Sequence, residues 1–325
     1  MGITQSEIVY VFLYDPHTWF GEKNIELTGD KKTYLLNVID LSLRPKKSSY
    51  ILIADEYSMS NLPFFFPRSR RVSLLKENPS HTRTFDTAIL RKRYDLVLTH
   101  REDLIQSGPP FYRVDFSSNW TIRDPISLNN IRKTKLASFI GSINHPRKGG
   151  HAFRQDVAKI LLKRDDIECF GKGIKTIEYK TEGLVSYCFS VAMENSRENF
   201  YYTEKIIDCF FTDTVPIYWG CPGIDGIFDD RGILTFESIA ELILILDGLT
   251  LEKYWEMLPY VRANKLRCID LGLDSFNNYL LRCAKAVEAH LPYPNNILKS
   301  WQISKPMAGV RMCMERFLPQ ITFPW

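Results

Sequence analysis

Residues 189–224 read FSVAMENSRENFYYTEKIIDCFFTDTVPIYWGCPGI. The apolar run Tyr187–Met193, which overlaps the start of this stretch, predicts a buried strand that ends at Glu194. Thr203 is a favourable N-cap, and the apolar stripe that follows it predicts a helix. Val215–Trp219 predicts a second strand, so the stretch reads as a strand–helix–strand unit of a parallel sheet.

The same alternation of strands and helices extends outward in both directions. Helical spacing predicts a helix near Phe153–Arg164 and a mainly helical region from Leu251 onward. Further apolar runs bounded by turn residues predict strands at Ile8–Tyr14, Tyr50–Ala54, Val72–Leu75, Leu96–Thr99, Leu136–Ile140 and Ile167–Phe170.

The polar stretch Asp115–Lys135 has no clear period and predicts the connection between two domains. We therefore predict α/β domains over residues 1–125 and 136–300, each with a parallel sheet, and a tail over 301–325 that packs back on them. Ligands of parallel sheets bind beyond the carboxyl ends of the strands, which places the chemistry in the cleft between the domains.

Composition excludes several classes of protein. Of the 325 residues, 45% are hydrophobic and 25% are charged, which is typical of globular proteins and excludes disordered or collagen-like chains. The net charge of +4 is too balanced to indicate nucleic-acid binding, but it is compatible with an anionic small molecule. No apolar run reaches the ~18 residues of a membrane span.

The N-terminus and the cysteines bear on location. No signal-peptide pattern is present, although Met1–Ser6 fits the short myristoylation motif, which often matches by chance. The 7 cysteines are scattered without a Cys-x-x-Cys pair, which predicts reduced thiols and a cytoplasmic protein. The basic, Phe-rich segment Phe64–Arg71 reads as an acceptor-side loop, with peripheral membrane contact as the alternative.

The first candidate site is the predicted helix start at Thr203. Unpaired N–H groups and the helix dipole suit a phosphate at this position, and Glu204 is common in a first turn. Lys205 is disfavoured there by the dipole, so it needs a nearby anion, which a bound diphosphate would supply. The alternative is a solvated lysine with no ligand.

Two further features could carry chemistry. The segment Gly141–Arg147, followed by Arg154 at a helix start, suggests anion binding, although Gly149 and Gly150 could serve only to shape a turn. Glu77 follows the predicted strand Val72–Leu75 and could act as a general base, although a glutamate there usually faces solvent.

Other chemistries lack their motifs. The sequence has no Asp-x-Asp, the usual metal–diphosphate clamp of many sugar transferases, and the 6 histidines show no zinc-ligand spacing. Neither a glycine-rich nucleotide-binding motif nor Gly-x-Ser-x-Gly occurs.

The run over 189–224 closely resembles the α-1,3/4-fucosyltransferase family, glycosyltransferase family 10, and especially its bacterial members. That family carries Phe-Glu-Asn, then Tyr-x-Thr-Glu-Lys, a helix, and Val/Ile-Pro-Ile/Val-Tyr-Trp-Gly. Met193 stands where the family usually has phenylalanine. Weaker likeness extends over the C-terminal half, and the N-terminal half matches faintly, as expected if it carries acceptor specificity.

The resemblance implies a GT-B fold, in which an acceptor-binding and a nucleotide-sugar-binding Rossmann-like domain face each other across a cleft. It implies inverting transfer of fucose from GDP-fucose to a glycan hydroxyl, without a metal or other cofactor. It implies that Arg154 contacts the diphosphate, Lys205 a phosphate and Glu204 a ribose hydroxyl. The donor-binding residues that it implies are Arg154, Glu194, Asn195, Tyr201, Thr203, Glu204 and Lys205.

The same resemblance points to Glu77 as the catalytic base. The family's base lies in a phrase like Gly-Glu-Asn-Glu-Ser, which Lys76–Ser80 matches in part, and Glu56 or Glu102 would be next. Two alternative functions remain open: transfer of a different nucleotide-activated sugar, and a non-catalytic module that binds a nucleotide sugar or glycan.

Overall fold

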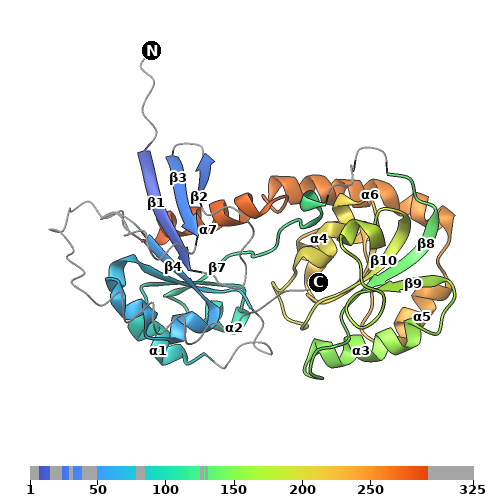
Figure 1. The fold of residues 1–325 in the computed structure, drawn as a ribbon, viewed down its shortest axis with the longest axis horizontal. Coiled ribbons are helices and arrows are strands. Elements are labelled where there is room, and N and C mark those ends of the chain that lie inside the picture. The colour runs from blue at the N-terminus through green and yellow to red at the C-terminus, as the bar shows by residue number, and fades with distance from the viewer. Residues whose placement is uncertain are drawn as a thin grey trace, which may run out of the picture.

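The computed structural model describes residues 7–14, 24–28, 32–38, 50–77, 85–124, 128 and 131–291. These residues form two lobes side by side, each built on its own sheet (Figure 1). Three expectations fall outside the described residues: the Met1–Ser6 motif, the Asn78–Ser80 end of the candidate base motif, and the tail over 301–325.

The N-terminal lobe contains a 7-stranded sheet in the order β2-β3-β1-β4-β5-β6-β7. Its strands are β1 (Glu7–Tyr14), β2 (Asn24–Thr28), β3 (Lys32–Val38), β4 (Tyr50–Ala54), β5 (Arg71–Leu75), β6 (Leu96–Thr99) and β7 (Phe111–Arg113). All neighbouring pairs are parallel except β2 with β3. The predicted strands in this half are confirmed, whereas β2 and β3 were not predicted.

The two faces of this sheet are covered by helices from different parts of the chain. Side chains alternate between faces along a strand, so Ile51 and Ile53 pack toward α1 (Thr87–Arg93) and α2 (Glu102–Gln106). Leu52 packs on the opposite face, against α7 (Phe276–His290). Helix α7 thus lies in the range predicted for the C-terminal domain but completes the core of the N-terminal one.

The C-terminal lobe contains a 5-stranded sheet in the order β12-β11-β10-β8-β9, parallel throughout. Its strands are β8 (Lys135–Ile140), β9 (Ile167–Phe170), β10 (Tyr187–Met193), β11 (Val215–Trp219) and β12 (Leu234–Thr235). Every residue of β10 and β11 is buried, as expected for central strands covered on both faces. The surrounding helices are α3 (Gly150–Leu161), α4 (Glu204–Phe211), α5 (Ile239–Asp247) and α6 (Leu251–Asp270).

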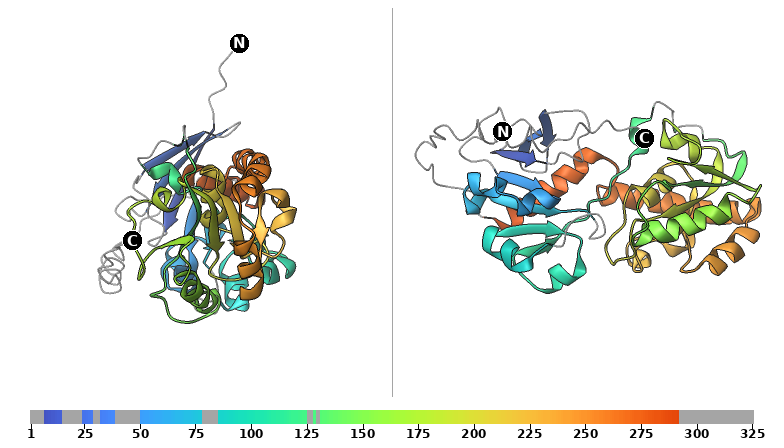
Figure 2. Two further views of the ribbon diagram at one scale, coloured as in Figure 1. Left: turned by 90° about the vertical axis from the view of Figure 1, so that its right-hand side faces the viewer. Right: turned by 60° about the horizontal axis from the view of Figure 1, so that its bottom comes forward.

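Two connections join the lobes. After β7, the described residues 114–124 run as irregular chain with a short 3-10 turn, η4 (Thr121–Arg123), within the stretch predicted as the linker. Helices α6 and α7 carry the chain back, as Figure 1 and the right view of Figure 2 show. The carboxyl ends of the N-terminal strands therefore meet residues that follow β10 in the C-terminal sheet.

No helix among the described residues is both long and apolar enough to cross a membrane. The cysteines within the described part of the chain are free thiols: Cys169, Cys188, Cys209, Cys221, Cys268 and Cys283.

Candidate active site

A cavity of about 230 Å³ lies where the two lobes meet. Its walls come from the segments after β5, β6 and β10, the linker, the first turn of α4, and helix α7. The lining residues are Lys76, Glu77, His100, Phe116, Ser118, Trp120, Asn195, Phe200, Tyr201, Tyr202, Thr203, Glu204, Lys205, Phe276 and Tyr279. Most candidates from the sequence are among them, whereas Arg154 and Glu194 lie behind the wall.

Glu194 fixes the start of α4 through hydrogen bonds with Thr203. Its side chain is fully buried at the end of β10, and its carboxylate accepts the Thr203 N–H at 2.8 Å and the Thr203 hydroxyl at 2.7 Å. Thr203 occupies the predicted N-cap position, but its hydroxyl donates to Glu194 and makes no capping bond to the helix. A Cβ atom at Gly220 would lie 2.5 Å from Cγ of Glu194, so the end of β11 requires glycine there.

Arg154 organises the loop that carries Asn195. It is 5% exposed, and its Nη2 donates to the Met193 carbonyl at 2.6 Å and to Asn195 Oδ1 at 2.7 Å. Burial lowers the pKa of Arg154, although the charge of Glu194 opposes that effect. Gly150 donates its N–H to the Asn195 carbonyl, and a Cβ at Gly150 would come within 2.4 Å of that oxygen. The glycine therefore serves close packing of α3 against Asn195.

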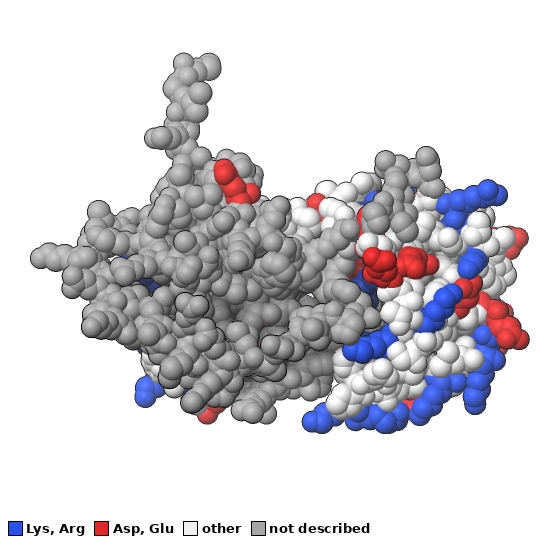
Figure 3. Space-filling model, in the orientation of Figure 1, with Lys and Arg blue, Asp and Glu red and all other residues white. Residues whose placement is uncertain are grey.

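Arg147, the other arginine of the second candidate site, does not line the cavity. Its guanidinium pairs with Asp156 of α3 at 2.9 Å on the surface. Figure 3 shows that Lys and Arg side chains are interspersed with Asp and Glu side chains over this face of the C-terminal lobe. Arg147 is thus one of several surface cations with a neighbouring carboxylate.

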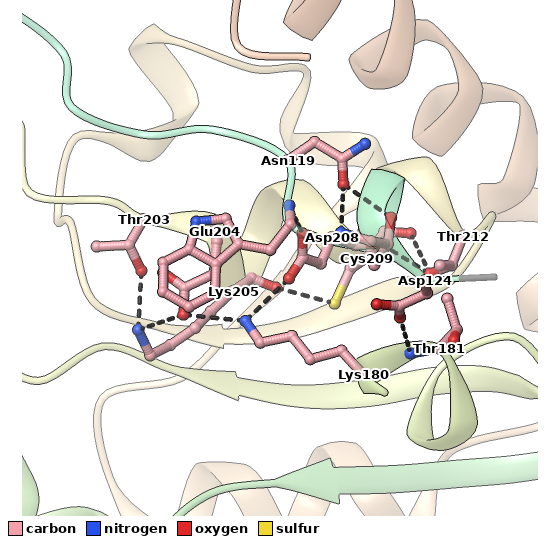
Figure 4. A network of polar contacts seen from close by, with 12 residues as sticks. Asn119, Asp124, Lys180, Thr181, Thr203, Glu204, Lys205, Asp208, Cys209 and Thr212 are labelled. Atoms are coloured by element: carbon pink, nitrogen blue, oxygen red, sulfur yellow. Dashed lines mark hydrogen bonds and ion pairs between the residues drawn. The ribbon is translucent and has the colours of Figure 1, made fainter. Parts of the chain in front are cut away.

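Lys205 has carboxylate partners on two sides. Its Nζ lies 3.3 Å from Glu194 and 3.2 Å from Glu204, and it donates to the Thr203 hydroxyl at 2.9 Å. Figure 4 shows the ammonium beside Thr203 and Glu204 at the start of the helix. A lysine in the first turn of a helix needs a nearby anion, and here Glu194 and Glu204 supply it.

Lys180, which the sequence analysis missed, connects α4 to the linker. Its Nζ lies 3.0 Å from both Glu204 and Asp208 and 4.6 Å from the centre of the Trp120 ring (Figure 4). Asp208 also accepts the Trp120 N–H at 2.7 Å. These contacts hold the linker residue Trp120 against the cavity wall.

The charged groups in this network shift one another's pKa values. Burial alone would raise the pKa of Glu204, but the charges of Lys180 and Lys205 outweigh it and hold that pKa below its ordinary value. Burial raises the pKa of Asp208 to about 6, because the nearby Glu204 charge offsets part of the attraction of Lys180. Of the two carboxylates that pair with Lys180, Glu204 is therefore the one held more firmly in its ionised form.

Glu77 lies on the opposite, N-terminal side of the cavity. Its side chain is 40% exposed, and the residue is the second one after the end of β5. Burial raises the pKa of Tyr201, and the charges of Glu194 and Glu77 raise it further, so Glu77 acts on a residue of the other lobe. Glu102 does not line the cavity and instead accepts from Asn199 at 2.7 Å, and the Glu56 side chain is outside the described set. Of the carboxylates considered as base, Glu77 alone among those described lines the cavity.

His100 is a second residue that the sequence analysis missed, because histidines were considered only as metal ligands. It follows β6, is 2% exposed, and packs 4.9 Å from the ring of Tyr201. Burial lowers its pKa to about 4, so the ring is neutral at pH 7. Its Nε2 has no hydrogen-bond partner in the described part of the chain. Its position directly after a predicted strand was the available signal.

Among the described residues, no group of three or more His, Cys, Asp or Glu side chains is arranged to hold a metal ion. The charged groups that line the cavity are Lys76, Glu77, Glu204 and Lys205. On the α4 side the lining offers one cation, Lys205, next to the carboxylate of Glu204, and on the β5 side it presents the carboxylate of Glu77.

The sequence resemblance is confirmed by comparison with known proteins. Residues 130–250 match the family model for glycosyltransferase family 10 (fucosyltransferase), C-terminal part. The α-(1,3)-fucosyltransferase FucT of Helicobacter pylori is 24% identical over an alignment of 259 residues, and the match covers 69% of this chain and 54% of the relative. The chain thus spans about half the length of that curated relative.

Solved structures show the same fold. A crystal structure of α1,3-fucosyltransferase with GDP superposes with a TM-score of 0.53 at 16% identity and covers 91% of this chain and 95% of that one. A structure of α1,3-fucosyltransferase with GDP-fucose gives 0.51 at 17% identity, with the same coverage. The two sheets, parallel except for the β2–β3 pair, and these similarities establish the GT-B fold, as the resemblance implied.

Proposed function

We propose that this chain, whose residues 130–250 form a family 10 C-terminal domain, is a glycosyltransferase that transfers fucose from GDP-fucose to a hydroxyl of an oligosaccharide or glycan. The observation that carries the proposal is the cavity between the lobes. There Glu204 and Lys205, within the segment that matches the family, line the same space as Glu77 of the other domain.

The proposed reaction is a single displacement with inversion at the sugar's anomeric carbon. Glu77 takes the proton of the acceptor hydroxyl while that oxygen attacks the anomeric carbon, and the bond to the diphosphate oxygen breaks. Negative charge grows on the departing GDP as this bond breaks. A base on one wall and a cation on the other match the two ends of this displacement.

The groups proposed to stabilise the leaving diphosphate are Lys205 and the backbone N–H groups at the start of α4. Each preorganised donor of this kind contributes about 3–4 kcal/mol of transition-state stabilisation. Arg154 already donates to Met193 and Asn195, so in our proposal it acts first by orienting the Asn195 amide toward the donor. Direct contact of Arg154 with the diphosphate stays a prediction.

We infer that transfer needs no metal ion or other cofactor. The sequence has no Asp-x-Asp, and in our proposal the cation next to the diphosphate is Lys205 of α4. Full activity after exhaustive treatment with EDTA would support this inference. Loss of activity that Mg²⁺ or Mn²⁺ restores would contradict it.

The test of the proposed function is a product assay with purified protein. GDP-fucose, GDP-mannose and UDP-sugars are each offered with a set of oligosaccharides, and the product's linkage and anomeric configuration are determined by NMR. A ligand at 100 times its Kd also stabilises the fold by about 2.7 kcal/mol, so a thermal-shift screen ranks the donors independently. Transfer from another nucleotide sugar and not from GDP-fucose would show that the enzyme uses a different donor. Thermal stabilisation by a donor without any product would show that the protein is a non-catalytic binding module.

A further inference from the structure

The side chain of Asp55 binds the backbone of the segment that carries Glu77. The residue directly follows β4, and its side chain is 3% exposed. Its Oδ1 accepts the backbone N–H groups of both Lys76 and Glu77, each at 2.9 Å. Strands β4 and β5 are paired in parallel, so this carboxylate connects the carboxyl ends of two neighbouring strands.

We propose that Asp55 is a positioning residue for the reaction and fixes Glu77 at the distance from the acceptor hydroxyl that proton transfer requires. The inference rests on the proposed function, because it depends on Glu77 acting as the base. Asp55 is not among the residues that line the cavity and would act only through the Lys76–Glu77 segment.

The backbone of Asp55 supports a specific role for its side chain. Its φ of 43° lies in the left-handed region, which costs energy for every residue except glycine. Aspartate is among the residues that tolerate this conformation better, but glycine would adopt it without strain. A strained residue persists where other contacts compensate for it, and here two hydrogen bonds from its carboxylate do so.

Lys76 links the two carboxylates through its ammonium group. Its Nζ lies 4.0 Å from Asp55 Oδ2 and 3.9 Å from Glu77 Oε1, and its side chain is 8% exposed. A nearly buried ammonium needs negative partners, and Asp55 provides one on the side away from the cavity. At 4.0 Å this ion pair is looser than the two N–H bonds of 2.9 Å, so the hydrogen bonds are the contacts to which we assign the positioning role.

Buried hydrogen bonds also fix the turn that follows Asp55. The Ser58 hydroxyl donates to the Ile53 carbonyl at 2.9 Å, and the Ser73 hydroxyl donates to Ser58 at 2.8 Å. Ser58 and Ser73 are fully buried, so the turn after β4 is tied to the interior of β5. This buried hydrogen-bonded support can hold Glu77 to the sub-ångström tolerance that catalysis requires.

Two variants separate the side chain's contacts from its charge and strain. Asp55→Gly relieves the φ strain, which favours folding, but removes the acceptor of the two N–H bonds. Asp55→Asn keeps an oxygen that can accept them. We expect kcat to fall about 10²-fold in Asp55→Gly, with the Kd for GDP-fucose unchanged, and to recover most of its wild-type value in Asp55→Asn.

Asp86 offers a matched control in the same lobe. Its carboxylate also accepts two backbone N–H groups, those of Ala88 and Ile89 at 2.9 and 3.0 Å, as the N-cap of α1. Asp86→Ala should lower the thermal midpoint and leave kcat at the wild-type value. Amide hydrogen exchange over Val72–Glu77 supplies a readout that needs no turnover, and protection there should fall in Asp55→Gly only.

The outcomes are distinct. Wild-type kcat in Asp55→Gly, or unchanged exchange over Val72–Glu77, overturns the inference and leaves the proposed function standing. An Asp55→Asn variant as slow as Asp55→Gly also overturns it, because the carboxylate's charge rather than its hydrogen bonds would then matter. If the wild-type protein transfers no sugar from any donor, the proposed function fails and the positioning role fails with it.

Discussion

Glu194 accepts two hydrogen bonds from Thr203, one from its backbone N–H at 2.8 Å and one from its hydroxyl at 2.7 Å. The contact ties the end of β10 to the residue that starts α4. Since Lys205 also lies 3.3 Å from the same carboxylate, Glu194 sets where this ammonium stands relative to the cavity. The buried carboxylate thus connects packing of the C-terminal lobe to the proposed donor site.

Thr203→Val should weaken both the fold and donor binding. The substitution keeps the shape of the side chain but removes one of the donors to a fully buried carboxylate, which costs about 2 kcal/mol. We expect a lower free energy of unfolding in urea and weaker GDP-fucose binding by calorimetry. Thr250→Val is the control: Thr250 caps α6 by accepting the Lys253 N–H, so its loss should lower stability by about 1 kcal/mol without affecting the donor. Equal donor affinity in the two variants would contradict the role of Glu194.

Lys205→Met should slow transfer and weaken donor binding together. The change removes the cation proposed to face the diphosphate, with an expected loss of about 3–4 kcal/mol of transition-state stabilisation. Initial rates give kcat, and calorimetry gives the Kd for GDP-fucose. Lys159→Met serves as control, because Lys159 is an exposed residue of α3 that pairs with Asp156 on the surface and does not line the cavity. A donor Kd in Lys205→Met that matches the control would place the diphosphate elsewhere.

Glu77→Gln should separate chemistry from binding. The amide keeps the size of the side chain but cannot take a proton, so kcat should fall about 10²–10⁴-fold while the Kd for GDP-fucose is retained. The same pair of measurements, initial rates and calorimetry, checks this expectation. Full activity of Glu77→Gln would assign the base to another group.

His100 should make stability depend on pH. Its pKa in the folded protein is about 4, below the ordinary value of 6.5, because burial disfavours the charged ring. Between these values the unfolded chain binds more protons than the folded one, so stability that is present above pH 6.5 is lost as the pH falls toward 4. By pH 5 this loss amounts to about 2 kcal/mol.

The measurement compares His100→Gln with the wild type in urea unfolding at pH 7.5 and pH 5. Both proteins lose stability through their other groups, but the wild type should lose about 2 kcal/mol more, since glutamine does not titrate. Equal losses in both proteins would show that His100 is protonated as easily when folded as when unfolded.

The local pattern of apolar and capping residues was enough to predict most of the strands and the start of α4. The strands from Tyr50–Ala54 to Val215–Trp219 that were predicted from apolar runs are present, because parallel strands covered on both faces are mainly apolar. The helix start at Thr203 was also predictable from a capping residue followed by an apolar stripe. The antiparallel pair β2 and β3 escaped prediction, since a partly polar edge has no comparable signature.

Most lining residues on the C-terminal side were identified from one continuous motif, since Asn195 to Lys205 follow a single strand and begin a single helix. Tertiary structure alone decided the rest. Asp55 meets Glu77 because β4 and β5 pair in parallel, and Lys180, which lies before β10, meets Glu204 because α4 packs back after that strand. Which sheet α7 covers was likewise undecided, because an apolar stripe states that a face is buried but not against what. Hydrophobic periodicity is a local property, whereas the partners of a buried charge depend on the topology of the whole chain.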